Sequence, residues 1–147
     1  MFKTDKTKAT GKLTVEIKDK QGNVKETREL KNLVVDTGLA FIASRMKDAT
    51  ATAMSHMAIG TGTSAAASGN TALGTEAARV ALTSTTVTTN AVAYVCSFAA
   101  GTGTGAITEA GILNAASTGT LLCRTVFSVV NKGASDSMTI TWTVTIS

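Results

Sequence analysis

The sequence predicts a mainly β protein: an antiparallel β-sandwich, jelly-roll or immunoglobulin-like, with an N-terminal hairpin and one short helix. Threonine, which favours strands, and alanine together make up about a third of the 147 residues. Seven or eight short runs with strand-like alternation are separated by turn residues roughly every ten positions. Only one stretch has helical spacing. The length suits one domain, which we place at residues 11–147 behind a basic N-terminal arm at residues 1–10.

The first element expected is a β-hairpin over residues 11–35. Leu13, Val15 and Ile17 alternate with polar residues, residues 19–23 supply a turn, and the chain returns from residue 24. The polar alternate positions indicate a sheet with one face in water.

The second element expected is a helix over residues 37–47, where the apolar spacing changes to three and four. Asp36 or Thr37 is the expected N-cap, because short polar side chains accept hydrogen bonds from free N–H groups at a helix start. The apolar face is expected to consist of Leu39, Ile42, Ala43 and Met46.

The main part of the sandwich is expected over residues 54–147. It begins with a short strand at 54–59 and a long glycine-rich surface loop at 60–76. Strands then follow at 80–87 and 91–98, which form a hairpin, and at 106–113, 121–130 and 138–146. In the last strand, apolar residues alternate with threonine, so one face is core. The threonine face is expected to be solvated or, alternatively, to meet a neighbouring chain.

The net charge of +4 lies in the first third of the chain. Residues 1–48 hold 11 of the 14 basic and 7 of the 10 acidic residues, whereas the remainder is neutral. A basic arm can contact phosphates or an acidic protein surface, or can simply be solvated. A nearly uncharged remainder suits packing against other protein chains better than binding a polyanion. The candidate contact residues of the arm are Lys3, Lys6, Lys8 and Lys12.

No enzyme site is indicated, and we expect no catalytic residue, metal, cofactor or small-molecule substrate. His56 is the only histidine, which excludes a histidine-based metal cluster. The glycine segments at 60–62 and 101–105 lack the lysine of a phosphate-binding loop, so we interpret them as turns. Cys96 and Cys123 lie in separate predicted strands. They could form a disulfide if those strands are neighbours, but free buried thiols are the favoured interpretation.

Two structural ion pairs are expected where charges are rare. Glu76 and Arg79 lie three apart, on what could be a helical turn, and Glu109 is matched with Arg124. Buried charges need partners, which favours this structural interpretation over a pair of catalytic carboxylates. No apolar run is long enough to span a membrane, and the polar N-terminus is unlike a signal peptide. We therefore expect synthesis in a cytoplasm.

Several segments in the second half of the chain resemble virion structural proteins of tailed bacteriophages. The order of the segments is similar to that of small head decoration, or cement, proteins. It also resembles the collar domain of tail fibres, with its glycine-containing MAxGxG segment and its later E-x-G-[IL]-[FL] segment. The residues that carry the resemblance are Met57–Thr63, Thr71–Glu76 with Arg79, Ile107–Asn114, Gly119–Leu122 and Arg124–Phe127.

The resemblance implies a non-enzymatic protein that binds the outside of an icosahedral head and stabilises the shell. The implied partners are the major capsid protein and further copies of the chain, as a homodimer or homotrimer, without membrane or nucleic acid. The implied location is the virion surface after synthesis in the bacterial host. The sequence ends directly after its last strand, which favours the head over a fibre with a long shaft. A tail adaptor or fibre-collar protein is the first alternative, and a basic nucleic-acid-binding protein is the second.

Overall fold

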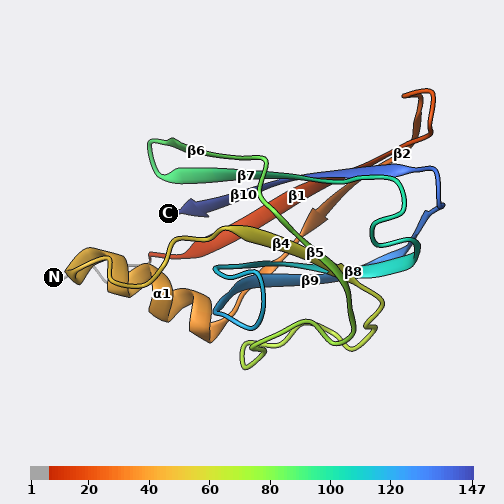
Figure 1. The fold of residues 1–147 in the computed structure, drawn as a ribbon. Coiled ribbons are helices and arrows are strands. Elements are labelled where there is room, and N and C mark those ends of the chain that lie inside the picture. Colours follow the sequence, from red (N-terminus) through yellow and green to blue (C-terminus); the bar gives the residue numbers. More distant parts are fainter. Residues whose placement is uncertain (1–6) are drawn as a thin grey trace, which may run out of the picture.

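A computed structural model describes residues 7–147 as two antiparallel five-stranded sheets that face each other, with one helix at one end (Figure 1). The predicted fold class, a mainly β sandwich with one short helix, is confirmed. The first sheet has the order β2 (Val24–Lys31), β1 (Ala9–Lys18), β10 (Ser137–Ile146), β7 (Ala91–Phe98), β6 (Ser84–Thr88). The second sheet has the order β3 (Leu33–Val34), β9 (Leu121–Lys132), β8 (Gly105–Leu113), β4 (His56–Gly60), β5 (Glu76–Ala81).

The N-terminal hairpin consists of β1 and β2, and its turn is closed by Asp19. The Asp19 carboxylate accepts hydrogen bonds from the N–H groups of Gln21 and Asn23, each at 2.9 Å. The hairpin ends at Lys31 rather than at residue 35 as predicted. Beyond it, β3 pairs with β9 of the second sheet. Val34 and Val35 are consecutive and both buried. A hairpin with one solvent-exposed face buries only alternate residues, so the chain leaves the first sheet here.

The helix α1 spans Asp36–Lys47, one residue longer than predicted. The predicted caps are wrong: Val35 is the N-cap and makes no side-chain cap bond, while Thr37 donates its hydroxyl to the Leu121 carbonyl at 2.8 Å. Of the predicted apolar face, only Ile42 packs against the core; Ala43 is exposed, Met46 is 85% exposed and Leu39 is 46% exposed. The helix lies on β9 through Gly38, its one buried residue, with Phe41 and Ile42 packed against the core beside it. This close approach sets the rotation of the helix.

The predicted strand at 80–87 is two strands in different sheets. The strand β5 ends at Ala81 in the second sheet, and β6 begins at Ser84 in the first. The connection crosses the sandwich at Leu82, which is partly buried against the core. As a consequence, β5 and β6 form edges of opposite sheets, and only β6 forms the predicted hairpin with β7.

The core lies between the sheets and consists mostly of the alternate residues that the sequence pattern places inside. Met138, Ile140 and Trp142 of β10 are buried, as expected from the regular alternation of this strand. Cys96 and Cys123 are both buried and free, in agreement with the favoured interpretation. Burial raises the pKa of each thiol, which keeps both protonated at neutral pH.

Candidate functional site

The candidate interface lies on the outer face of the first sheet, at its β1–β2 side. Leu13, Val15 and Ile17 of β1 point into the core, so the alternate residue Lys12 points outward. The register places Lys12 directly opposite Lys31 of β2 and, on its other side, opposite Thr143 of β10. A hollow of about 360 Å³ on this face is lined by Thr10, Gly11, Lys12, Lys31, Thr143 and Thr145.

Lys12 and Lys31 form a like-charged cross-strand pair without a carboxylate partner. Both residues are exposed, and neither takes part in any ion pair found among residues 7–147. Elsewhere on the same hairpin, Lys18, Lys25 and Arg28 each have a carboxylate partner, whereas Lys20 in the turn has none within the described part of the chain. Like charges directly opposite each other destabilise a sheet. An acidic group bound at this point would therefore relieve an unfavourable interaction.

The candidate arm residues are divided between the sheet and the undescribed terminus. Lys8 is exposed and pairs through its backbone with Ser147, where its amide donates to the Ser147 carbonyl at 2.6 Å. Lys12 lies within β1 rather than on an arm, because β1 already begins at Ala9. Lys3 and Lys6 lie outside the described residues. Sequence reasoning missed Lys31, since its position opposite Lys12 depends on a β-bulge after Ile17 that no local pattern reveals.

The rest of the outer face of the first sheet carries no charge. The outward residues of β10 are Ser137 and four threonines, and in β7 the residues between buried Tyr94, Cys96 and Phe98 are small or apolar. Only serine and threonine face outward from β6. The face is thus divided into a charged strip on β1 and β2 and an uncharged area on β10, β7 and β6. Such a division suits contact with a protein surface better than binding along a polyanion.

Glu109 of β8 and Arg124 of β9 form a buried ion pair in the second sheet. The guanidinium donates from Nε and Nη2 to one carboxylate oxygen at 3.1 and 2.9 Å, and both side chains are almost completely buried. The loop of residues 61–75 covers the pair. Backbone N–H groups of Gly62, Gly74 and Thr75 donate to the carboxylate at 2.9, 2.8 and 2.7 Å. The carboxylate therefore organises the glycine-rich loop.

This environment holds Glu109 as a carboxylate whose two oxygens accept hydrogen bonds from the loop and from Arg124. Burial alone would raise its pKa, but the hydrogen bonds from Thr75, Gly74, Arg124 and Gly62 outweigh burial and lower the pKa below its usual value. The glycine segment at 60–62 directs an amide at this internal carboxylate instead of at a ligand phosphate. The carboxylate thus joins β8, β9 and the glycine-rich loop in the folded chain.

Glu76 and Arg79 also form an ion pair, but on strand β5 rather than on a helical turn. The guanidinium donates to the two carboxylate oxygens at 3.0 and 2.7 Å. Residues three apart on a regular strand point to opposite faces. The register shift between Ile59 and Gly60, however, leaves Ala77 as an extra residue, and this bulge brings both side chains to one side. Arg79 additionally donates to the carbonyls of Ala115 and Thr118 at 3.0 and 2.8 Å.

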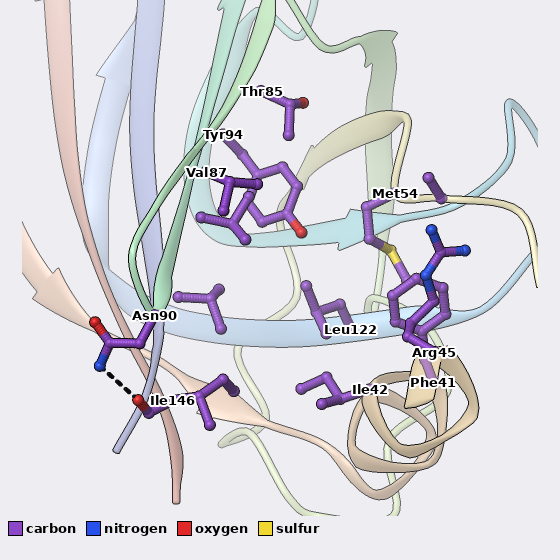
Figure 2. Close-up of a pocket in the computed structure, with 13 residues that line it drawn as sticks. Phe41, Ile42, Arg45, Met54, Thr85, Val87, Asn90, Tyr94, Leu122 and Ile146 are labelled. Atoms are coloured by element: carbon purple, nitrogen blue, oxygen red, sulfur yellow. Dashed lines mark hydrogen bonds between the residues drawn. The ribbon is translucent and has the colours of Figure 1, made fainter. Parts of the chain in front are cut away.

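An apolar pocket of about 330 Å³ opens between α1 and the ends of the sheets (Figure 2). Phe41 and Ile42 of the helix face Leu122, Tyr94 and Ile146, which come from three different strands. Burial raises the pKa of Tyr94 to about 12, a direction that Cys123 supports and Arg45 opposes. The phenol is thus neutral at physiological pH, and no nucleophile–base pair lines the pocket. His56 lies elsewhere, with Nδ1 2.8 Å from the Ser55 hydroxyl.

Comparisons of the chain with protein-family models, with curated proteins and with solved structures found no match. Within residues 7–147, no group of three or more metal-ligating side chains is close enough together to hold an ion. In the same part of the chain, no helix is long and apolar enough to cross a membrane.

Proposed function

We propose that this chain is a non-enzymatic structural protein of a tailed-phage virion, a decoration protein that binds the outside of the head and stabilises the shell. The observation that carries this proposal is the unneutralised pair Lys12 and Lys31 beside a broad uncharged sheet face. Two lysines that line a hollow on this face suit carboxylates on a protein partner. The partner we propose is the major capsid protein, which binds the chain after synthesis in the host cytoplasm.

The arrangement of the resembling segments supports a structural role. Gly62, Thr75, Glu109 and Arg124 come from the separate segments that carry the resemblance to phage virion proteins, and they contact one another around the buried ion pair. Those residues therefore serve the architecture of the second sheet. We therefore place the interface with a partner on the first sheet.

The described charges favour a protein partner over nucleic acid. Tight binding to a nucleic acid requires contacts to many phosphates, each neutralised by lysine or arginine. The outward positions of β10, β7 and β6 offer none. On a shell, by contrast, a modest interface is repeated by symmetry, and linked copies bind with high avidity.

The first test is the copy number of the protein in purified virions, measured by quantitative mass spectrometry against the major capsid protein. We expect several hundred copies, near one per capsid subunit. A copy number of about a dozen or fewer would contradict the head role and favour the tail adaptor or collar alternative. Absence from the particle would contradict both.

The second test concerns the lysine pair. Replacing Lys12 and Lys31 together by glutamate is expected to weaken binding to shells purified without the protein about tenfold or more, because attraction to acidic groups becomes repulsion. Binding is measured by co-sedimentation at several salt concentrations. The matched control replaces Lys20 and Lys47 by glutamate. Both residues are exposed and lie away from the hollow, and this change alters the net charge equally. An equal loss in both double variants would refute a specific lysine site.

Deleting residues 1–12 would not test the arm cleanly, because it removes the first four residues of β1. That strand lies in the interior of the first sheet, between β2 and β10. The charge reversal leaves the backbone hydrogen bonds of β1 intact. The same double variant also tests the nucleic-acid alternative, which predicts salt-dependent DNA binding at physiological ionic strength by the unaltered protein and its loss on charge reversal.

A further inference from the structure

The strand β6 forms an open edge of the first sheet, at the top of the view in Figure 1. All of its residues, Ser84–Thr88, are exposed, and Val87 is 70% exposed. An edge strand presents unpaired N–H and C=O groups, which only another extended strand can satisfy in a regular way. The chemistry of this edge therefore selects a β-strand as its partner.

The other three edges are protected, whereas β6 is not. The edge strand β2 is rich in lysine, glutamate and arginine, β3 has only two residues, and β5 carries the Glu76–Arg79 ion pair. Charged side chains and short edges are the usual means by which proteins prevent pairing between sheets. The strand β6 has no charged residue and no proline.

The register identifies which backbone groups of β6 are free. The Asn90 carbonyl accepts a hydrogen bond from the Ile146 amide of β10, so alternate residues of β7 from Ala91 onward bond to β6. Their partners in β6 are Ser84, Thr86 and Thr88. The backbone groups of Thr85 and Val87 consequently point away from the sheet.

We propose that β6 pairs with β6 of a second copy, antiparallel about a two-fold axis at Thr86, to form a continuous ten-stranded sheet. In this register, Thr85 of each copy faces Val87 of the other, and each such pair exchanges both N–H···O bonds. Ser84 faces Thr88, so the segment is nearly self-complementary and brings no charges together. A two-fold contact requires such self-complementarity.

The pairing also covers apolar surface. The side chains of Thr85 and Val87 line the apolar pocket, on the inner side of β6 (Figure 2). In the paired form, Val87 of each copy lies beside Thr85 of the other, so the rims of the two pockets adjoin. Contact between two β-branched side chains is favourable at such cross-strand positions. The proposal rests on the proposed structural function and names a surface for the self-association that the resemblance implies.

The test measures the self-association of the isolated full chain by sedimentation velocity from micromolar to millimolar concentration. We expect a reversible monomer–dimer equilibrium. Thr86→Lys and Thr86→Glu are each expected to weaken dimerisation about tenfold or more, since like charges would meet at the two-fold axis. An equimolar mixture of the two variants is expected to regain dimer, because opposite charges then face each other.

The matched control is Thr141→Lys, which places the same charge on an exposed residue of β10 in the middle of the sheet, and it should dimerise like the unaltered chain. Circular dichroism and thermal unfolding check that every variant is folded. A chain that stays monomeric throughout, or a mixture that regains no dimer, would overturn the proposal. Neither outcome concerns the lysine pair on β1 and β2, so shell binding is tested separately.

Discussion

Replacing Arg124 by methionine is expected to lower the free energy of unfolding by about 3–5 kcal/mol, because it leaves the Glu109 carboxylate buried without its counter-charge. Arg124 also holds the loop through Asn70 Oδ1 at 2.9 Å and the Ser64 carbonyl at 3.1 Å. Loss of these bonds should loosen residues 61–75. Urea denaturation measures the free energy, and amide hydrogen exchange measures the opening of the loop.

The control for this substitution is Arg79→Met. Its partner Glu76 is about a third exposed and can regain water, so the loss should stay below about 2 kcal/mol. A second comparison adds Glu109→Gln to Arg124→Met, which removes the orphaned charge and should recover part of the loss. If the double variant is no more stable than Arg124→Met, the buried charge is not the source of the destabilisation.

The pH dependence of the free energy of unfolding is an independent test of the buried ion pair. Because the pKa of Glu109 is lowered in the folded protein, the unfolded chain binds the proton first as the pH falls below about 4.5. The ion pair thus contributes stability that is complete above that pH and is lost on acidification. The Glu109→Gln variant should show a shallower decline. Part of the loss of stability on acidification should remain in this variant, because the pKa of Asp136 is also lowered, mainly by the hydrogen bond from Lys25.

Replacing Gly38 by alanine is expected to cost about 3 kcal/mol, although alanine is the better helix former. A Cβ atom at this position would overlap the carbonyl oxygen of Leu122 in β9. That carbonyl cannot easily move, since it accepts the Val35 amide at the start of the helix. The helix must therefore shift away from the sheet, and the apolar pocket beside Phe41 should widen. Thermal unfolding and denaturant titration measure the loss.

Gly69→Ala is the matched control for Gly38→Ala. A Cβ atom at Gly69 would meet no atom within 4 Å, and the backbone there is not in the left-handed region. Its effect should stay within about 0.5 kcal/mol. A gain in stability from Gly38→Ala would show that helix propensity outweighs the close approach to β9, and that the helix is not held by Gly38.

Local sequence patterns were sufficient to predict most of the strands and the presence of the helix. The alternation of Met138, Ile140 and Trp142 with threonine predicted both the strand and its buried face, because the period of two is a property of the extended backbone itself. The matching of Glu109 with Arg124 followed from the scarcity of charge in the second half of the chain. Such inferences need only neighbouring residues or composition.

The face of the helix could not be read in this way. Leu39 and Met46 have the spacing of a buried stripe, yet Gly38 is the residue that contacts β9. Helical spacing defines a stripe, but the closest approach of two backbones decides which side is buried. The same limit applies to the segment at 80–87, whose continuous pattern hid the crossing at Leu82 between sheets.

By itself, the sequence determined the fold class, most of the strand positions, the single helix and the location of the net charge. Only the tertiary structure decided which strands share a sheet, that Lys31 lies opposite Lys12, and that β6 is an uncharged open edge. Periodicity is set by the backbone over a few residues. Sheet membership, register and edges depend on pairing between distant segments, and a single bulge changes that pairing.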